Sequence, residues 1–370
     1  MIVDHLCVNY GAVFFEDLFL ALQERNIEQN VFYPRHRNHL SNISGQAYRV
    51  DSPLVLGLHT KASFRWKRRI MKEQYHPLFQ RNKPDIIHAH TLFSDGSLAD
   101  YYYRRYGTPF IVAVRSTDVD VFLKYKPWLK SYCKQILKNA TYIIFISASL
   151  KNKFQEIFGL QFESKSAIIP NGINQSYFSI ETKEKRDLHN PLELLYVGSF
   201  LKRKRVPDLI RLVESITARL TIVGAGGANE NRVSKMAAKS EKVTFLGKIK
   251  DQSSIKEVYR NSDIFIMASQ RETFGLVYIE AMSQGLPVIY SKNTGIDGLF
   301  EQGSVGYPVT PGSITEMQQG IEKISSSYQE ISNNCIIEAR QFNWGNIAER
   351  YAAIYTEIAE NVTRNISGKD

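Results

Sequence analysis

The chain has 370 residues and a mass of 42.4 kDa, about twice the usual length of a single domain, so two domains are expected. With 43% hydrophobic and 23% charged residues, its composition is ordinary for a globular protein and excludes global disorder. Three scattered cysteines, Cys7, Cys133 and Cys335, are too few for a disulfide framework or a structural zinc site, which indicates a reducing compartment.

The net charge of +10 lies almost entirely in the first half of the chain. Residues 1–180 hold 23 Lys and Arg against 14 Asp and Glu, whereas residues 181–370 hold 24 against 23. Such a one-sided surplus predicts an anionic partner, such as nucleic acid, a phosphorylated substrate or an acidic membrane surface. No stretch approaches the ~18 apolar residues of a membrane span, and Asp4 and His5 interrupt the start where a signal peptide would be apolar. We therefore expect a cytoplasmic protein.

Short runs of β-branched and aromatic residues alternate with segments of helical apolar spacing, the pattern of β-α units around parallel sheets. In the first half the predicted strands are Ile2–Val8, Asn30–Tyr33, Asp85–His90, Phe110–Arg115, Tyr142–Ile146 and Ala167–Ile169. In the second half they are Leu192–Val197, Leu220–Val223, Val243–Leu246, Ile264–Ala268 and Pro287–Tyr290. The sequence thus predicts an α/β fold with two doubly wound, Rossmann-like domains that face each other across a cleft.

A turn signal at Pro170–Gly172 and a polar stretch without apolar period at Ser179–Pro191 mark the expected domain boundary and linker. We predict an N-terminal domain over residues 1–178 and a C-terminal domain over 179–345. The remaining residues, 346–370, are predicted to form a helix that packs back on the N-terminal domain. Because open α/β folds bind ligands at the carboxyl ends of their strands, we expect the functional site in the cleft.

The segment from Asp263 to Tyr290 carries two carboxylates around a predicted helix start. A strand ends near Ser269, Glu272 lies in the following loop, and the helix is expected to begin around Phe274–Gly275, with Glu280 inside it. Backbone N–H groups at such a helix start suit a phosphate, and Gly275 would let a ligand approach closely. Alternatively, Glu280 is a solvated helix carboxylate and Glu272 a first-turn residue favoured by the helix dipole.

Four consecutive cations, Lys202–Arg205, follow a predicted strand that ends at Gly198. Held in a cleft, such cations would bind a diphosphate strongly, although the run could equally be a solvated basic loop. The Gly-rich turn at 224–227 lacks the dinucleotide fingerprint, because Asn229 stands where that fingerprint needs glycine, so we reject nicotinamide binding. Gly11 either brings backbone N–H groups near a substrate or forms a simple tight turn.

The basic surplus concentrates in Lys61–Lys72 and Lys124–Lys138. Lysines recur every four residues in the second stretch beside Trp128 and Tyr132, which suits a helix lying on anionic lipid headgroups; a solvated helix face is the alternative. No nucleic-acid-binding module is found, so nucleic acid is not expected as a partner. The His88–His90 pair lacks the partners of a metal site, so no metal is expected either.

Glu272 and Glu280 resemble the Glu-x7-Glu motif of retaining glycosyltransferases with the GT-B architecture, specifically family 4, also called glycosyl transferases group 1. The likeness covers most of the chain. Further segments that resemble the family are Ile169–Asn174, Phe200–Arg205, Phe245–Gly247 and Phe342–Trp344. The chain departs from the family at Ser199, where a loop arginine is common, and at Arg115, where a histidine is common.

The resemblance implies roles for individual residues. The catalytic set is Glu272, which would bind the transferred sugar, Lys204, which would hold the diphosphate, and Arg115, which stays protonated and cannot act as a general base. The implied donor-binding set has Glu280 on the ribose, backbone amides at the helix start, and Arg203 or Arg205 as a substitute for the missing guanidinium. Its members are Glu280, Phe274, Gly275, Leu276, Gly198, Ser199, Arg203 and Gly11.

The implied activity is transfer of a hexose-like sugar, with retention of configuration, from a UDP- or GDP-sugar bound by the C-terminal domain. No metal or other cofactor would be required. The acceptor, a saccharide or a lipid-linked molecule in surface polysaccharide or glycolipid synthesis, would bind the N-terminal domain at the cytosolic face of an anionic membrane. The alternatives are a catalytically degenerate GT-B subunit that acts as a scaffold, and a sugar-nucleotide epimerase, which would not be expected to carry these motifs.

Overall fold

A computed structural model describes the chain except for residues 12–13, 37–46, 58–59, 61–62, 179–186 and 368–370. It divides into two compact units. Unit 1 comprises Met1–Ile146, Leu150–Gly172 and Trp344–Asp370, and unit 2 comprises Ser147–Ser149 and Ile173–Asn343. The chain thus enters unit 2 at Ile173, before the predicted boundary at 178, and most of the predicted linker falls outside the described residues.

Unit 1 is built on a parallel sheet of seven strands in the order β4-β2-β1-β6-β7-β8-β9. The strands are β1 (Ile2–Leu6), β2 (Glu28–Phe32), β4 (Arg49–Asp51), β6 (Ile86–Ala89), β7 (Phe110–Val114), β8 (Tyr142–Phe145) and β9 (Ser166–Ile168), with β3 (Arg35–His36) and β5 (Leu54–Leu56) forming a separate pair. Strand β1 lies between β2 and β6, so the strand order reverses there. The carboxyl ends of β1 and β6 therefore flank the point where ligands bind in such sheets.

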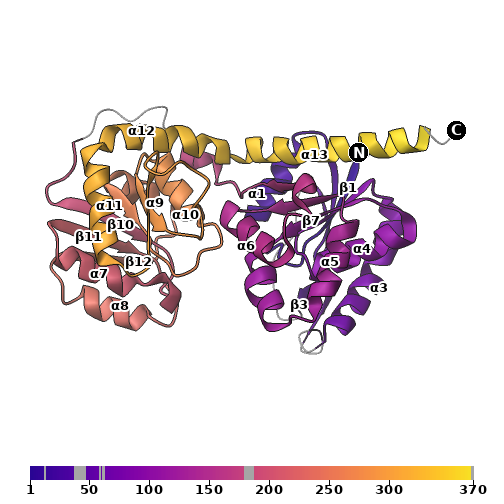
Figure 1. Ribbon diagram of the computed structural model, residues 1–370, viewed down its shortest axis with the longest axis horizontal. Coiled ribbons are helices and arrows are strands. Elements are labelled where there is room, and N and C mark those ends of the chain that lie inside the picture. The colour runs from indigo at the N-terminus through magenta and orange to yellow at the C-terminus, as the bar shows by residue number, and fades with distance from the viewer. Residues whose placement is uncertain (12–13, 37–46, 58–59, 61–62, 179–186, 368–370) are drawn as a thin grey trace. The chain divides into compact units, whose positions relative to one another are not determined.

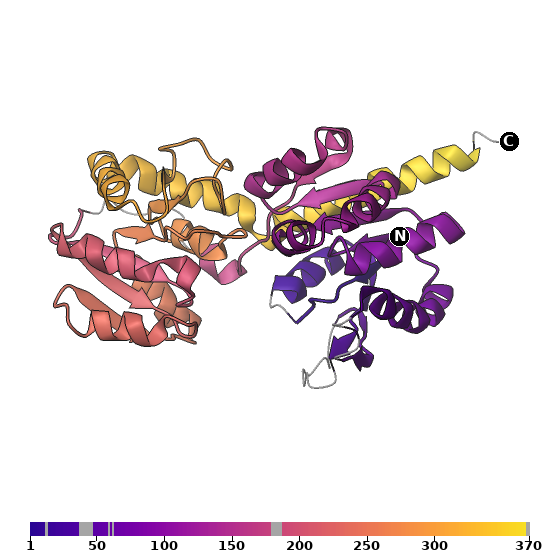
Figure 2. The same cartoon turned by 60° about the horizontal axis from the view of Figure 1, so that its bottom comes forward.

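Helices lie on both sides of this sheet (Figures 1 and 2). The helices of unit 1 are α1 (Phe14–Gln23), α3 (Phe64–Asn82), α4 (Ser94–Tyr106), α5 (Leu129–Asn139), α6 (Ala148–Phe158) and α13 (Trp344–Ser367). On one side α13 packs against α1 and β6, and on the other α4 packs against α3, α5 and β7. The C-terminal helix thus contributes to the core of unit 1, where Tyr351, Tyr355 and Ile358 are buried.

Three histidines are buried together in that core. His5 on β1 is the register partner of His88 on β6, and His90 follows on the same side of the sheet. The His5 Nδ1 and His90 Nε2 atoms are 3.0 Å apart, and His88 Nδ1 lies 2.7 Å from the Tyr355 hydroxyl. Burial lowers the pKa of all three rings, so they are neutral at pH 7.

One nitrogen from each of these rings lies within 4.8 Å of the other two, which is close enough to share a metal ion. Only His88 and His90 were recognisable as a pair from the sequence, because His5 is 85 positions from His90 in the chain. The hydrogen bonds already occupy one nitrogen of each ring; His90 stacks against His5 and His88, and the rings also make tilted or edge contacts with Phe15 and Phe19. The cluster therefore has a clear role in packing the core.

Unit 2 is built on a parallel sheet of six strands in the order β12-β11-β10-β13-β14-β15. The strands are β10 (Leu192–Val197), β11 (Ala218–Val223), β12 (Val243–Gly247), β13 (Ile264–Ile266), β14 (Val288–Ser291) and β15 (Gly306–Val309). The helices are α7 (Val206–Glu214), α8 (Glu230–Ala237), α9 (Gln252–Arg260), α10 (Leu276–Ser283), α11 (Ile314–Ser326) and α12 (Tyr328–Ala339). Here the strand order reverses between β10 and β13, so their carboxyl ends flank the expected ligand position.

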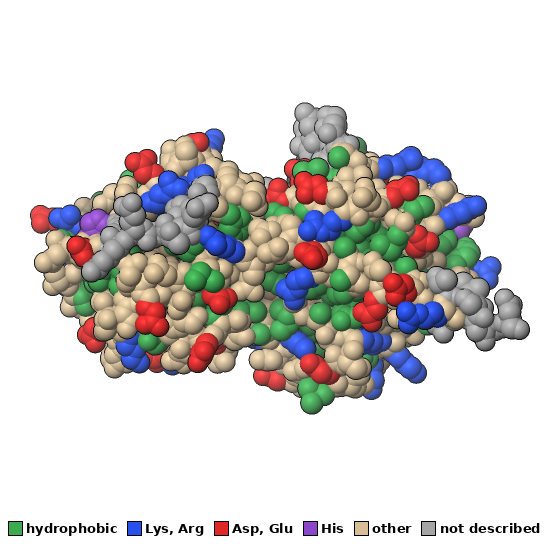
Figure 3. All heavy atoms as spheres, turned by 90° about the horizontal axis from the view of Figure 1, so that it is seen from above, with side chains coloured by type: hydrophobic (Ala, Val, Ile, Leu, Met, Phe, Trp, Pro, Cys, Tyr) green, Lys and Arg blue, Asp and Glu red, His purple; other side chains and the backbone are tan. Residues whose placement is uncertain are grey.

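Every strand predicted from the sequence overlaps a strand of the structure, and both sheets are parallel as predicted. The predicted start of the helix at Phe274–Gly275 is wrong by one to two residues, because α10 begins at Leu276 and Gly275 is its N-cap. Over the described part of the chain, every helix is too short or too polar to cross a bilayer. On the face drawn in Figure 3, basic side chains lie interspersed with acidic ones.

Candidate functional site

Two loops of unit 2 meet at the carboxyl ends of β10 and β13. After β10, a short 3₁₀ turn, Lys202–Lys204, carries the basic run, and after β13 a loop leads to Gly275. The Gln270 amide donates to the Arg203 carbonyl at 2.8 Å, and the Arg203 Nη1 donates to the Arg271 carbonyl at 2.7 Å. These bonds fasten the two loops together at the point where the strand order reverses.

Lys204 and Glu272 form an ion pair within these loops. The Lys204 ammonium donates to the Glu272 Oε2 atom, and the two side chains are only 10% and 11% exposed. The same ammonium lies 3.4 Å from the Met267 sulfur, and the Arg203 Nη1 is 4.0 Å from Glu272 Oε2. The site therefore combines two cations with one carboxylate, where surrounding protein strengthens their interaction relative to water.

Hydrogen bonds hold the main chain of Glu272 in place at both its amide and its carbonyl group. Its amide donates to the Thr294 hydroxyl at 2.8 Å, and that hydroxyl donates to the Glu272 carbonyl at 2.6 Å. The Gly295 amide donates to the same carbonyl at 3.1 Å. The Glu272 Oε1 atom accepts from the Thr273 amide at 3.2 Å. The carboxylate is thus oriented before any ligand binds.

Gly275 connects this loop to helix α10. Its φ of 87° lies in the left-handed region, and a Cβ placed there would come within 2.6 Å of the Tyr278 ring and 3.1 Å of Glu272 Cγ. A side chain at this position would therefore be strained in its backbone and would collide with its neighbours. The first amides of a helix lack partners within it, so the start of α10 places hydrogen-bond donors beside Glu272 and Lys204.

Glu280 lies about one turn further along α10. The Tyr259 hydroxyl from α9 donates to its Oε2 atom at 3.0 Å, and Tyr259 itself is fully buried. Burial raises the pKa of Glu280, while the hydrogen bond from Tyr259 lowers it by a smaller amount. The interpretation of Glu280 as a solvated helix carboxylate is therefore wrong, because the side chain is oriented by a buried partner.

Gly198 and Ser199 follow strand β10 and lie beside the glycine-rich turn. A Cβ on Gly224 would lie 1.8 Å from the Gly198 carbonyl oxygen, so only glycine permits this approach of two chain segments. The Tyr196 hydroxyl donates to the Ser199 carbonyl at 2.8 Å, and the Phe200 amide donates to the Gly226 carbonyl at 2.6 Å. The role of the turn at 224–227 is thus partly structural, since it supports the loop that carries the cations.

The two remaining predicted residues, Arg115 and Gly11, belong to unit 1. The Arg115 Nε donates to the His90 carbonyl at 3.0 Å, and the guanidinium lies 5.8 Å from the centre of the Phe15 ring. Gly11 lines a cavity of about 600 Å³, and a Cβ there would lie 3.0 Å from the Tyr33 hydroxyl. The structure thus brings Lys204, Glu272 and the start of α10 together, places Glu280 further along the same helix, and leaves Arg115 and Gly11 in the other unit.

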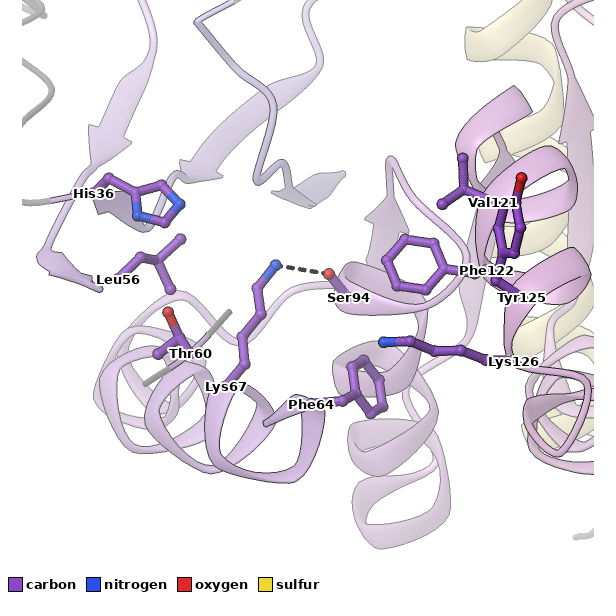
Figure 4. Close-up of a pocket in the computed structure, with 10 residues that line it drawn as sticks. All are labelled: His36, Leu56, Thr60, Phe64, Lys67, Ser94, Val121, Phe122, Tyr125 and Lys126. Carbon is purple, nitrogen blue, oxygen red and sulfur yellow. Dashed lines mark hydrogen bonds between the residues drawn. The ribbon is translucent and has the colours of Figure 1, made fainter. Parts of the chain in front are cut away.

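A second cavity of unit 1, about 350 Å³ in volume, escaped the sequence analysis (Figure 4). Its lining comes from several separate chain segments and includes Lys67 on α3, Ser94 at the start of α4, and Tyr125 and Lys126 after the π-helical turn Asp118–Leu123. The sequence signal was present in the basic stretch Lys61–Lys72, although its charges were assigned to a membrane surface.

Two family models match the chain and together cover most of it. The model described as "Glycosyltransferase Family 4" matches residues 11–177, and the model described as "Glycosyl transferases group 1" matches residues 179–342. The second match contains all the loops of the unit 2 site, including Lys204, Glu272 and Glu280.

Proteins with related sequences are named as synthases or glycosyltransferases. N-acetyl-alpha-D-glucosaminyl L-malate synthase of Bacillus anthracis is 26% identical over 298 residues, covering 75% of this chain and 76% of that protein. The capsular polysaccharide biosynthesis glycosyltransferase CapM of Staphylococcus aureus is 27% identical over 269 residues, covering 67% of this chain and 69% of that protein.

The fold is shared with HepE of Anabaena, solved in complex with UDP. The match has a TM-score of 0.72 and 17% identity and covers 96% of this chain and all of that one. At this identity the likeness concerns the fold. Since models of the same group of enzymes match both halves of the chain, and the architecture is theirs, the protein belongs to the GT-B glycosyltransferases of the glycosyl transferases group 1, family 4.

Proposed function

We propose that the protein transfers a sugar, with retention of configuration, from a UDP- or GDP-sugar to a saccharide or lipid-linked acceptor. One observation carries this proposal: Lys204, Glu272 and the start of α10 converge where the strand order of unit 2 reverses. Cations and helix N-termini at such a place suit a diphosphate. The relative HepE has been solved with UDP, which supports a nucleotide donor.

Departure of the nucleotide diphosphate builds negative charge on its phosphate oxygens. In our proposal the Lys204 ammonium and the backbone amides of Phe274, Gly275 and Leu276 stabilise this charge. The Arg203 guanidinium, 4.0 Å from Glu272, supplies a second cation. It takes the place of the loop arginine that is common in the family at the position of Ser199. The contacts to the developing charge come from the protein alone, so the proposal requires no metal ion.

The nucleoside would be bound through its ribose. Glu280 is the proposed acceptor for the ribose hydroxyls, since its carboxylate is already oriented by the buried Tyr259 hydroxyl. Gly198 and Ser199, at the end of β10, would leave room for the nucleotide beside the cations. The hydrogen bonds from the ribose hydroxyls to Glu280 are strongest while Glu280 is ionised. In the ionised carboxylate both oxygens act only as acceptors, whereas a protonated carboxyl carries an O–H donor.

The transferred sugar would be held by Glu272, whose orientation is fixed by Thr294 and Gly295. As the sugar becomes oxocarbenium-like, the nearby carboxylate also offsets its positive charge. Acceptor attack on the face that the diphosphate leaves gives retention without a protein nucleophile. Arg115 and Gly11 are proposed to contact the substrates from unit 1, with Arg115 as a cation, because a guanidinium cannot serve as a general base.

We further propose a role in surface polysaccharide or glycolipid synthesis in the cytoplasm, at the membrane face. The name of the relative CapM supports the polysaccharide part. The membrane part rests on exposed cations and aromatics: Lys130, Lys134 and Lys138 on α5 are exposed, and Trp128 before α5 and Trp66 on α3 are 71% and 49% exposed. Sedimentation with liposomes of increasing phosphatidylserine content tests it, and binding that ignores lipid charge would refute it.

The alternative of a non-catalytic GT-B scaffold has one specific observation in its favour. Arg115 replaces the expected histidine and already donates to the His90 carbonyl, so no general base stands at that position. A scaffold would bind nucleotide without breaking the donor bond. Slow hydrolysis of the donor in the absence of acceptor therefore distinguishes the two functions.

The experiment that tests the proposal combines binding with turnover. A thermal-shift panel of UDP-, GDP- and ADP-sugars identifies the donor, since ligand binding to the folded state raises the melting temperature. Release of free nucleotide from that donor is then followed with and without EDTA, and the anomeric configuration of the product is read by proton NMR. We expect hydrolysis that survives EDTA and a product with the donor's configuration. No shift with any donor, or an inverted product, would overturn the proposal.

A further inference from the structure

Unit 1 carries two neighbouring cavities at the carboxyl ends of its strands. The larger, about 600 Å³, is lined by residues that follow β1 and β2, among them Asn9, Gly11 and Tyr33. The smaller, about 350 Å³, is lined in part by residues that follow β6 and β7, and otherwise mainly by residues of β3, β5 and the start of α3. The two share His36, Leu56 and Lys67, so they adjoin each other, and we call the pair the twin cavity. Volumes of this size suit a small molecule.

Among the described residues that line the twin cavity, the polar side chains are basic or neutral. Figure 4 shows the Lys67 amine directed at Ser94 and the Lys126 amine directed into the same space from the other side, and the residues drawn include no carboxylate. The Lys67 Nζ donates to the Ser94 hydroxyl at 2.8 Å. Arg35 adds a cation to the lining of the larger cavity. Several cations around one space favour an anionic occupant.

Lys67 is the central residue because it lines both cavities. Its side chain is half-buried, and burial lowers its pKa, while the nearby Asp95 carboxylate opposes that shift. A buried amine gains more from an anion than an exposed one, because less water competes for it. The Ser94 hydroxyl, which accepts from Lys67, can donate its own proton to a bound phosphate, whereas the Thr60 hydroxyl already donates to the Gly57 carbonyl at 2.7 Å.

The opposite wall of the smaller cavity is aromatic. Phe64 and Phe122 line it, and Tyr125, which is 67% exposed, stands at its rim. The Lys126 amine lies 5.6 Å from the centre of the Phe122 ring, so cation and aromatic face are combined there. Flat apolar surface beside cations suits an amphiphilic molecule with an anionic end and a ring or chain next to it.

We infer that the twin cavity binds the acceptor and that this acceptor carries a phosphate or diphosphate group. The phosphate lies between Lys67 and Lys126 and accepts from Ser94, and the adjoining sugar or isoprenoid packs on Phe122 and Tyr125. This assignment rests on the proposed transferase function, and it adds the chemical class of the acceptor. Two sources share the chemistry: a water-soluble sugar phosphate and a lipid-linked phosphate.

The test is titration calorimetry of the full chain with three compounds. Glucose 1-phosphate represents the soluble source, farnesyl diphosphate the lipid-linked source, and methyl α-glucoside is the uncharged control. Each titration is repeated with saturating donor nucleotide, which keeps the ligand out of the unit 2 site. We expect both phosphate compounds to bind and the uncharged glucoside to bind at least about tenfold more weakly. The phosphate compound that binds more tightly identifies the source of the acceptor.

The variants Lys67→Met and Lys126→Ala should each weaken binding of the phosphate compounds by about tenfold. Lys153→Met on α6 is the matched control, because Lys153 is also half-buried in unit 1 but lines neither cavity. Melting temperatures and donor affinity of all three variants should match the parent, which separates this test from that of the donor site. The inference is overturned if neither phosphate compound binds, if the glucoside binds as well, if added nucleotide displaces the ligand, or if Lys153→Met weakens binding equally.

Discussion

Lys204 and Glu272 are 68 residues apart in sequence and form an ion pair where the loops after β10 and β13 meet. An ion pair with so little exposure is weak proof of stabilisation, because desolvation of both charges offsets their attraction. Its position is more informative than its energy. Glu272 holds the Lys204 ammonium in the place where a departing diphosphate would need it, so the charge is oriented before the reaction begins.

Replacing Lys204 should therefore cost catalysis. In the variant Lys204→Met we expect donor hydrolysis and transfer to fall by at least about tenfold, because the charge on the leaving diphosphate loses its main cation. The measurement is steady-state release of nucleotide. Lys202→Ala is the matched control, since Lys202 lies in the same turn but is exposed. Equal rates for Lys204→Met and the parent protein would refute the role of Lys204.

Donor binding should weaken in acid because of Glu280. Burial raises the pKa of this carboxyl, so it becomes protonated at a higher pH than an ordinary glutamate and then no longer accepts from the ribose. We expect affinity for the donor sugar nucleotide to fall as the pH decreases from 7.5 to 5. In Glu280→Gln the affinity should be lower at neutral pH and nearly independent of pH.

Tyr259→Phe provides the complementary variant for the same titration. The Tyr259 hydroxyl donates to Glu280 and favours its ionised form, so its removal should shift the loss of affinity to higher pH. An intact sugar nucleotide is the correct ligand, because free UDP itself gains a proton in this range. A Glu280→Gln variant that binds the donor as tightly as the parent protein at neutral pH, with the same pH dependence, would show that the Glu280 carboxylate does not contact the donor.

Gly275→Ala should destabilise unit 2 more than the same substitution at another glycine with a left-handed backbone conformation. Both Gly275 and Gly226 have positive φ, at 87° and 77°, but a Cβ on Gly226 meets nothing within 4 Å. Gly226→Ala should therefore cost about 1 to 2 kcal/mol from backbone strain alone. Gly275→Ala should cost at least about 1 kcal/mol more, because its Cβ collides with Tyr278. Urea unfolding measures both, and equal losses would contradict the predicted collision.

The buried histidines should make unit 1 sensitive to acid. Burial lowers the pKa of His5 from 6.5 to about 3, so below pH 6.5 the unfolded chain gains a proton at this residue and the folded chain does not. Folding stability from His5 is therefore complete above pH 6.5 and lost progressively below it. In His5→Phe this loss is absent, so between pH 7.5 and 5.0 the variant should gain about 2 kcal/mol relative to the parent.

Asp4, Asp95 and Asp118 act in the opposite direction, because burial raises their pKa values to about 6, 7 and 6. In the folded chain they bind protons at a pH where the unfolded chain does not, which favours folding in acid. The stability of the parent alone is therefore ambiguous, and the difference between His5→Phe and the parent is the quantity to measure by urea unfolding. A difference that stays constant from pH 7.5 to 5.0 would contradict the neutral, buried state of His5.

The strands were predictable because both sheets are parallel and buried. Their apolar, β-branched runs, such as Phe110–Val114 and Leu192–Val197, stand out from the polar segments around them. Strands β3, β4, β5 and β15 were not predicted. Strands β3 and β5 form a separate pair of two and three residues, β4 and β15 lie at sheet edges, and β15 contains a glycine and a proline, so their sequences carry little strand signal.

The sequence predicted which residues belong to the site better than it predicted the hydrogen bonds and ion pairs between them. Lys204, Glu272, Gly275 and Glu280 were identified from motifs, but the ion pair between Lys204 and Glu272 follows from strand order and could not be read from spacing. The hydrogen-bond partner of Glu280 was not predictable for the same reason, since Tyr259 lies on another helix. The start of α10 was misplaced because Phe274 extends the apolar pattern of the helix, whereas the left-handed Gly275 delays it.

The central claim is that the unit 2 site binds the diphosphate and the ribose of a nucleotide. Titration calorimetry with UDP and with GDP, on the parent protein, Lys204→Met, Glu280→Ala and the control Lys202→Ala, tests it most directly. We predict that one nucleotide binds the parent and Lys202→Ala alike and binds each of the other two variants at least about tenfold more weakly. Binding of equal affinity in all four proteins, or no binding of either nucleotide to the parent, would contradict the claim.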